Sequence, residues 1–218
     1  MKTRNLCALG VLFALVFAFS AQAQQDKKDV KALKKELKDK AIKDARKEAK
    51  RIEKDDWFTQ PGTLPLDKQI EKAWMKEAEI DDYGFPAYFV GSGSALAGTQ
   101  SAAKLQASTI AKQDLAGRIS SSIAAIIETN IATEQLSAED AATIQQTVSA
   151  STEVISQKLA RVIPLTELYR KQDKNFECQI RIAYSQEMAK QAAKDVIAQE
   201  LEDKTNVTRE KLDKLMNF

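Results

Sequence analysis

The sequence predicts an α+β protein, in which a small, mostly antiparallel sheet carries helices on one side and follows a long charged N-terminal helix. Three observations lead to this class. Apolar residues recur at helical steps of three and four over most of the chain. Residues 176–184 alternate between apolar and polar, as a strand with one buried face does. The predicted strands are too few to close a barrel, so helices must cover the sheet.

The first 23 residues have the pattern of a cleavable signal peptide. Two basic residues precede an apolar run over 6–19, and the segment 20–23 (SAQA) supplies the small residues that signal peptidase accepts. We expect cleavage between Ala23 and Gln24. The run is shorter than the ~20 apolar residues of a transmembrane helix, so we expect no transmembrane segment in the mature chain. The competing interpretation is an uncleaved anchor or a buried helix.

Composition excludes several function classes. Removing the signal, with Lys2 and Arg4, leaves 31 basic and 31 acidic residues, which lacks the net basic charge of general nucleic-acid binding. The chain contains no histidine, which excludes Ser-His-Asp catalysis and His-ligated zinc. Cys7 leaves with the signal, and Cys178 lies on the apolar face of its predicted strand, where a thiol behaves as a small hydrophobe with a raised pKa. We predict no enzyme activity, no cofactor and no metal site.

Residues 26–56 predict a long, mostly solvated helix. They contain no Gly or Pro and hold 13 basic and 9 acidic residues, against 18 and 22 in residues 57–218. A narrow, alanine-rich stripe can cover a weak seam but cannot build a core. Two interpretations stay open, a coiled-coil or surface-binding arm and a charged spacer helix. The stripe consists of Val30, Leu33, Leu37, Ala41, Ala45, Ala49 and Ile52.

Prolines and a glycine in 57–65 end this helix. Trp57 and Phe58 are expected to staple the end of the arm to the body, because aromatic side chains bury the largest areas. A second helix is predicted next, and it ends at the turn 81–84. Its apolar face carries Leu66, Ile70, Ala73 and Trp74.

A β-prone segment, 85–90, leads into the glycine-rich sequence Gly91-Ser92-Gly93. The next glycine is Gly98, so the spacing differs from the dinucleotide fingerprint, and no P-loop lysine follows. We interpret these residues as a tight turn in which glycine supplies a positive φ. The alternative is a ligand-binding turn, formed by Gly91, Ser92 and Gly93, that captures an anion at the N-terminus of the following helix.

Further elements follow in the order helix, helix, strand, strand, helix. The helices are predicted over 99–132 and 137–160, and the strands over 162–171 and 176–184. Ser185 is expected to cap the last helix. The resulting organisation is a signal peptide (1–23), a charged helical arm (24–56), a Pro/Gly linker with a docking helix (57–84), an α+β domain (85–205) and a C-terminal tail (206–218).

Two groups of motifs resemble known families. Residues 88–95 (YFVGSGSA) with the alanine-spaced helix ending at 114–119 (DLAGRI) resemble small bacterial envelope proteins, grouped with the Helicobacter-type outer-membrane lipoprotein antigen and with flagellar outer-membrane assembly proteins. The charged arm, the Trp-Phe stretch at 57–64 and the segment 182–190 resemble uncharacterised exported proteins of Bacteroides-type bacteria. The resemblance covers roughly 85–200. It implies an envelope domain without enzyme activity that assembles with itself or with other envelope parts.

These observations predict a non-enzymatic, exported cell-envelope protein, periplasmic or at the outer-membrane periphery, that acts as a structural or assembly protein through protein–protein contacts, self-contacts included. Peripheral membrane association is compatible with this prediction. The alternative is a periplasmic binding module for a small anionic or glycan ligand, with Gly91–Gly93 as the ligand turn. Lipid anchoring is not expected, because the chain lacks the lipobox cysteine of the lipoprotein members.

Overall fold

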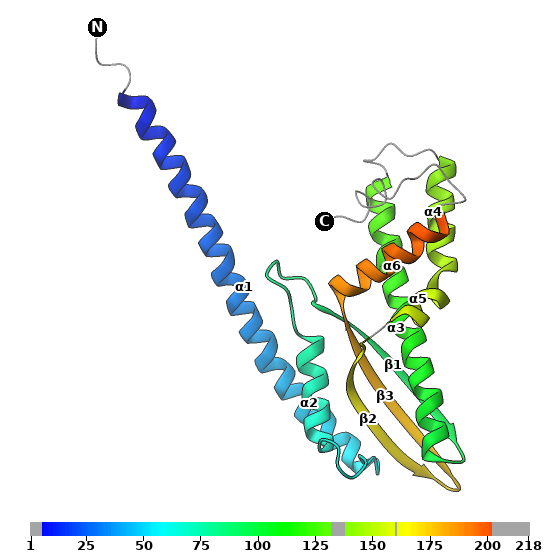
Figure 1. Cartoon of the computed structure of the whole chain (residues 1–218). Helices are drawn as coiled ribbons and strands as arrows, with labels where there is room; N and C mark the ends of the chain where they lie inside the picture. Colours follow the sequence, from blue (N-terminus) through cyan, green and yellow to red (C-terminus); the bar gives the residue numbers. More distant parts are fainter. Residues whose placement is uncertain (1–5, 132–137, 160, 202–218) are drawn as a thin grey trace.

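The computed structural model describes residues 6–131, 138–159 and 161–201, with side chains from Lys27 onward over most of these ranges. It confirms the α+β class (Figure 1). The predicted cleavage site at Ala23 lies where side chains are not described, and the tail 206–218 lies outside the described residues. The elements are α1 (Leu6–Lys54), α2 (Leu66–Glu77), β1 (Tyr88–Ala97), α3 (Gln100–Ile131), α4 (Ala138–Ala150), α5 (Thr152–Lys158), β2 (Ile163–Gln172), β3 (Asn175–Ser185) and α6 (Gln186–Leu201).

The three strands form one antiparallel sheet in the order β1–β3–β2. β2 and β3 form a hairpin that closes at the pair Gln172 and Asn175, and Asp173 adopts a φ of 51° in the turn. β1 pairs with the other edge of β3, from Tyr88 opposite Ser185 to Ala97 opposite Phe176. The strand predicted over 176–184 is therefore the central strand.

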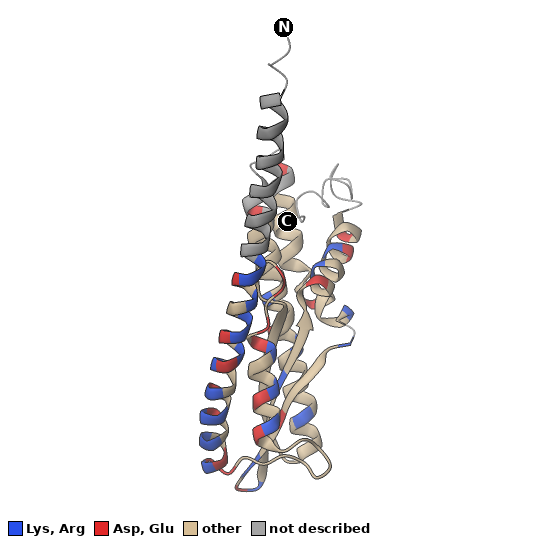
Figure 2. Ribbon diagram, turned by 90° about the vertical axis from the view of Figure 1, so that its left-hand side faces the viewer, with Lys and Arg blue, Asp and Glu red and all other residues tan. Residues whose placement is uncertain are grey.

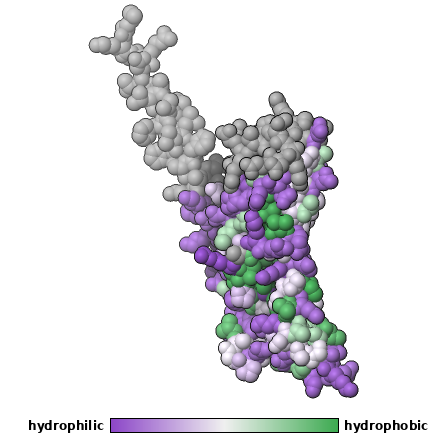
Figure 3. Space-filling model, turned by 45° about the vertical axis from the view of Figure 1, so that its right-hand side comes forward, coloured by the Kyte–Doolittle hydropathy of each residue, from purple (hydrophilic) through white to green (hydrophobic). Residues whose placement is uncertain are grey.

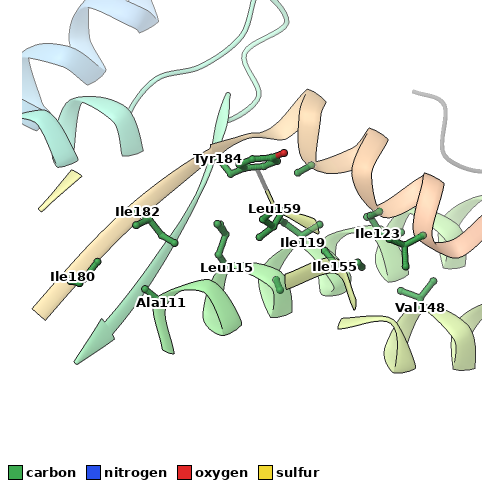
Figure 4. Packing of buried hydrophobic residues seen from close by; sticks show 14 of the residues in the cluster. Ala111, Leu115, Ile119, Ile123, Val148, Ile155, Leu159, Ile180, Ile182 and Tyr184 are labelled. Atoms are coloured by element: carbon green, nitrogen blue, oxygen red, sulfur yellow. The ribbon is translucent and has the colours of Figure 1, made fainter. Parts of the chain in front are cut away.

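One face of the sheet packs on α3. The apolar side chains of β3 that alternation predicted to be buried lie there, and Figure 4 shows Ile180 and Ile182 near Ala111 and Leu115 of α3. Helices α4, α5 and α6 complete this core. Cys178 is buried in it.

The other face of the sheet is covered in part by α1 and α2, which differs from the expected helices on one side. Ala45 and Ala49 of α1 pack with Ile70 of α2 and Leu168 of β2. The reason lies in the alanine stripe of α1, since alanines let two helices approach closely while the lysines stay in water. Figure 2 shows the basic and acidic residues distributed along α1.

The glycine-rich sequence is part of a strand, so the tight-turn prediction for Gly91–Gly93 is wrong. Both glycines lie inside β1 and neither has a positive φ. They face the alanine stripe of α3, and a Cβ on Gly93 would lie 2.2 Å from the carbonyl oxygen of Ala107. Glycine is needed here for close approach of a helix to a strand, rather than for backbone freedom.

The single helix predicted over 137–160 is two helices, α4 and α5, separated at Ser151. The Ser151 hydroxyl donates to the Thr147 carbonyl oxygen at 2.7 Å, and the Thr152 hydroxyl donates to that of Ser149 at 3.2 Å. Hydroxyl groups that bond backbone in this way compete with the helical ladder and bend helices. The helix predicted over 99–132 is confirmed as α3, and its N-terminus is capped by Thr99.

Candidate functional site

A groove of about 1020 Å³ opens between α1, α2 and β1. The residues of β1 that face away from α3, including Tyr88, Val90 and Ser92, line its floor with Arg181 of β3. Helix α1 contributes several charged side chains to the facing wall, among them Arg51. The groove exists because the α1–α2 pair packs toward β2 and leaves part of β1 and β3 uncovered.

An ion pair at the base of the groove joins α1 to the sheet. The Glu48 carboxylate accepts hydrogen bonds from the Arg181 guanidinium and from the Trp74 indole. The side chains of Glu48 and Arg181 are only 9% and 19% exposed. A charge-assisted contact of this burial holds α1 in one position against β3.

Glu77 is the second carboxylate near Arg181, at 3.8 Å. Burial raises the pKa of Glu77, although the positive charge of Arg181 opposes the shift. The carboxylate form is therefore disfavoured in the folded protein.

Glu77→Gln is expected to raise the melting temperature slightly at neutral pH. A raised pKa stabilises the fold while the group is protonated, and this contribution is lost as the pH rises through the folded-state pKa. The neutral amide of glutamine avoids this loss of stability at neutral pH. The increase in melting temperature should therefore vanish well below pH 4.5, where the Glu77 carboxyl is protonated in both the folded and the unfolded state. Thermal melts from below pH 4.5 to neutral pH test this prediction, with the exposed glutamate variant Glu53→Gln as the control. A gain that is equal at low and neutral pH would contradict the explanation.

The outer edge of β1, the edge that does not pair with β3, borders the groove. Arg118 of α3 lines the groove on this side. The Ser92 N–H donates to the Asp114 carboxylate at 2.8 Å, so Ser92 presents its backbone outward. By the two-residue period of a strand, Val90 and Ser94 do the same. Among the described residues, no backbone–backbone hydrogen bond reaches this edge between Phe89 and Ala97.

The opposite edge of the sheet, on β2, is closed by the chain itself. Phe58 exchanges two backbone hydrogen bonds of 2.8 Å with Tyr169. The Gln69 side chain accepts the Glu167 N–H at 2.7 Å, and Lys72 donates to the Pro164 carbonyl oxygen. The Phe58 bonds confirm that the Trp57–Phe58 stretch joins the end of the arm to the body, although Phe58 does so through its backbone and its ring stays 38% exposed.

The two edges of the sheet thus differ. The linker 57–72 covers the edge of β2 with backbone and side-chain partners, as edge strands usually require. On β1, the Asp114 carboxylate supplies one partner, and Arg118 holds that carboxylate through its Nε at 3.1 Å.

The residues of the predicted ligand turn, Gly91, Ser92 and Gly93, lie on opposite faces of β1 and do not form a turn. Ser92 lines the groove, whereas Gly91 and Gly93 point at α3 and are buried. Helix α3 begins only at Gln100, so these residues do not precede its N-terminus directly. Sequence reasoning missed Glu48, because its partner Arg181 lies far away in the chain and no local pattern links them.

No protein-family model matches the chain, and neither a curated protein nor a solved structure does so. The resemblance to envelope families therefore stays a prediction. Within the part of the chain that the structure describes, no three His, Cys, Asp or Glu side chains cluster so as to hold a metal ion. None of the helices in that part combines the length and apolar character needed to cross a bilayer.

The surface offers apolar side chains in small groups. On the face that Figure 3 shows, they lie among hydrophilic residues rather than in one broad patch. The feature of the site that is most suited to recognition is therefore the combination of a groove with an open strand edge.

Cys178 is expected to resist modification in the native protein. Burial raises the pKa of its thiol from 9.0 to about 11. At pH 8 the thiolate fraction, and with it the rate of reaction with an aromatic disulfide, should be roughly a hundredfold lower in the folded than in the urea-unfolded chain. The measurement uses a Cys7→Ser background. Equal rates in the two states would contradict burial of the thiol.

The same shift predicts a loss of stability at high pH. A raised folded-state pKa stabilises the fold below pH 9.0, and this stabilisation disappears as the pH rises toward about 11. Cys178→Ala should reduce this part of the alkaline pH dependence in urea denaturation.

Proposed function

We propose that this protein is a non-enzymatic, exported assembly protein of the bacterial cell envelope, and that it binds an extended segment of another protein along β1. The observation that carries the proposal is the outer edge of β1 beside the groove. Support for export comes from the signal pattern of the first 23 residues and from the family resemblance described above.

An extended polypeptide is the occupant that this edge suits chemically. Outward N–H and C=O groups of an edge strand pair with another backbone, and alternate side chains of the added strand then enter the flanking spaces. On one side of β1 that space is the groove with Arg51 and Glu77. From Gly91 onward the residues of β1 that face α3 are glycine and alanine, whereas Phe89 packs its ring on the core.

The shape of the site favours a single segment over a second copy of the fold. Over Tyr88–Ser92 the strand lies beside α1 at the bottom of the groove. A second copy would present its own β1 in an equally recessed position, so the two edges could not meet there. A slender extended chain can enter.

Asp114 has a specific role in this proposal. By accepting the Ser92 N–H it occupies one donor of the edge, which protects the unbound strand from unspecific pairing. Binding of a segment replaces this carboxylate with a backbone carbonyl, and Arg118 retains Asp114 nearby.

The test is photocrosslinking from position 96 in intact cells that export the protein. Leu96 is half exposed beside the outer edge of β1. We expect a defined crosslinked protein that is lost on Ser94→Pro, because proline removes an outward N–H that the fold does not use. Ser94→Thr, which keeps the N–H, is the matched control. Thermal melts verify that both variants are folded, and an adduct that persists in folded Ser94→Pro would contradict strand addition.

A second candidate is a binding module for a small anionic or glycan ligand. Arg51 lines the groove and can attract an anion there, whereas Lys47 pairs with Asp44 and Arg118 pairs with Asp114. A thermal-shift screen with inorganic phosphate and peptidoglycan fragments tests it. Stabilisation that is lost in Arg51→Ala would support this candidate, and the absence of any shift would remove it.

A further inference from the structure

The loop between α2 and β1 displays two aromatic side chains to solvent. Tyr83 is 85% exposed and Phe85 is 65% exposed. The loop rises beside α1, away from the sheet (Figure 1). Exposed aromatic side chains cost free energy in water, and two of them in one loop make it a candidate contact surface.

The loop holds these side chains in a defined shape. The Asp81 carboxylate accepts the N–H groups of Tyr83 at 2.8 Å and of Phe85 at 3.0 Å. The Asp81 N–H donates to the Phe85 carbonyl oxygen at 2.8 Å, and Gly84 supplies a φ of 89° in the turn. This network closes the turn without burying either ring. The exposure is thus built into the loop.

Lysines of α1 lie next to the tip. The Lys34 ammonium pairs with the Asp82 carboxylate at 2.8 Å. Lys34, and to a smaller extent Lys27, lowers the pKa of Asp82, which places both charges near the loop. Lys31 and Lys38 fall on the same face of the helix, at steps of three and four. We call Lys27, Lys31, Lys34 and Lys38 the lysine face.

The acidic groups near the tip already have contacts. Glu79 pairs with Lys76 at 2.7 Å, Asp82 pairs with Lys34, and Asp81 accepts the backbone bonds of the turn. Asp29 and Glu36 lie on α1 between the lysines, and residues 27–40 still hold seven lysines against three acidic residues. The α1 side of the aromatic tip is therefore basic, whereas the loop itself carries the acidic residues Glu79, Asp81 and Asp82.

We propose that the tip, Tyr83 and Phe85, together with the lysine face binds the surface of an anionic lipid bilayer. Aromatic rings favour the headgroup level of a membrane, and lysines extend their charge to the lipid phosphates. Two rings alone bind weakly, so the attraction of several lysines for anionic lipids is needed as a second contribution. A narrow loop tip can insert between lipid headgroups, because these move aside more easily than the packed surface of a protein. This site is separate from the groove and does not depend on the proposed function.

Sedimentation with lipid vesicles tests the proposal. The chain beginning at Gln24, without the predicted signal peptide, is mixed with vesicles of phosphatidylcholine alone or with one third phosphatidylglycerol. We expect binding to the anionic vesicles, weak binding to the neutral ones, and release at high salt. Tyr83→Ser/Phe85→Ser and Lys27→Glu/Lys31→Glu should each lower the vesicle partition coefficient by roughly tenfold.

Matched variants control for general changes of surface. Leu105→Ser removes a 71% exposed apolar side chain on α3, and Lys50→Glu reverses a charge farther along α1. Both should sediment as the unchanged protein does. The proposal is overturned if the unchanged protein does not sediment with anionic vesicles. That result is expected if the tip docks on a protein instead of a bilayer. It is also overturned if the Tyr83/Phe85 variant binds them equally well.

Discussion

Gly93→Ala is expected to lower the free energy of unfolding by about 3 kcal/mol. The new Cβ would lie 2.2 Å from the carbonyl oxygen of Ala107 and 2.5 Å from the backbone nitrogen of Ala111. Both atoms belong to the backbone of α3 rather than to a flexible side chain, so the clash can be relieved only if the helix moves away from the strand and their contact repacks. Urea denaturation followed by circular dichroism measures the change.

Gly98→Ala is the matched control. It lies just beyond β1, and a Cβ there would meet nothing within 4 Å. We expect its stability to stay within about 0.5 kcal/mol of the unchanged protein. If Gly93→Ala were as stable as Gly98→Ala, the close approach of α3 to β1 would be wrong.

Glu48→Ala is expected to cost about 3 kcal/mol, because it leaves the Arg181 guanidinium with little solvent and one distant carboxylate. The Trp74 indole N–H loses its acceptor at the same time. Release of α1 from the sheet should follow, and it should appear as faster amide exchange in α1 and as a change in tryptophan fluorescence.

Glu53→Ala is the control, since Glu53 is an exposed glutamate on the same helix. It should change stability by less than about 0.5 kcal/mol. The double variant Glu48→Ala/Arg181→Ala should be more stable than the sum of the single losses predicts, because neither charge is then left alone. Additive losses would show that the pair does not couple α1 to β3.

Much of the fold could be predicted from local pattern. The alternation over 176–184 identified the central strand and the buried Cys178, and helical spacing identified α3 and the alanine stripe of α1. The glycines of β1 misled the prediction, because a glycine that a turn needs and a glycine that a neighbouring helix needs look the same in a sequence. Only the position of Ala107 and Ala111 distinguishes them.

The candidate site was less predictable. Its base joins Glu48 to Arg181, and its open edge depends on where Phe58 and Asp114 reach the sheet. Periodicity reports which face of an element is apolar, but it carries no information on which distant element covers that face. For the same reason the polar side of β3 looked solvated, although α1 and α2 pack over part of it.

The sequence by itself determined the α+β class, the absence of histidine chemistry and the amphipathic faces, because these depend on residue type and on spacing along one element. The signal pattern and the compartment that it predicts also belong to the sequence. The tertiary structure decided which edge of the sheet stays open, where α1 docks and how the Tyr83–Phe85 tip lies beside the lysine face. Those features depend on contacts between residues far apart in the chain, and such contacts form only when the elements pack.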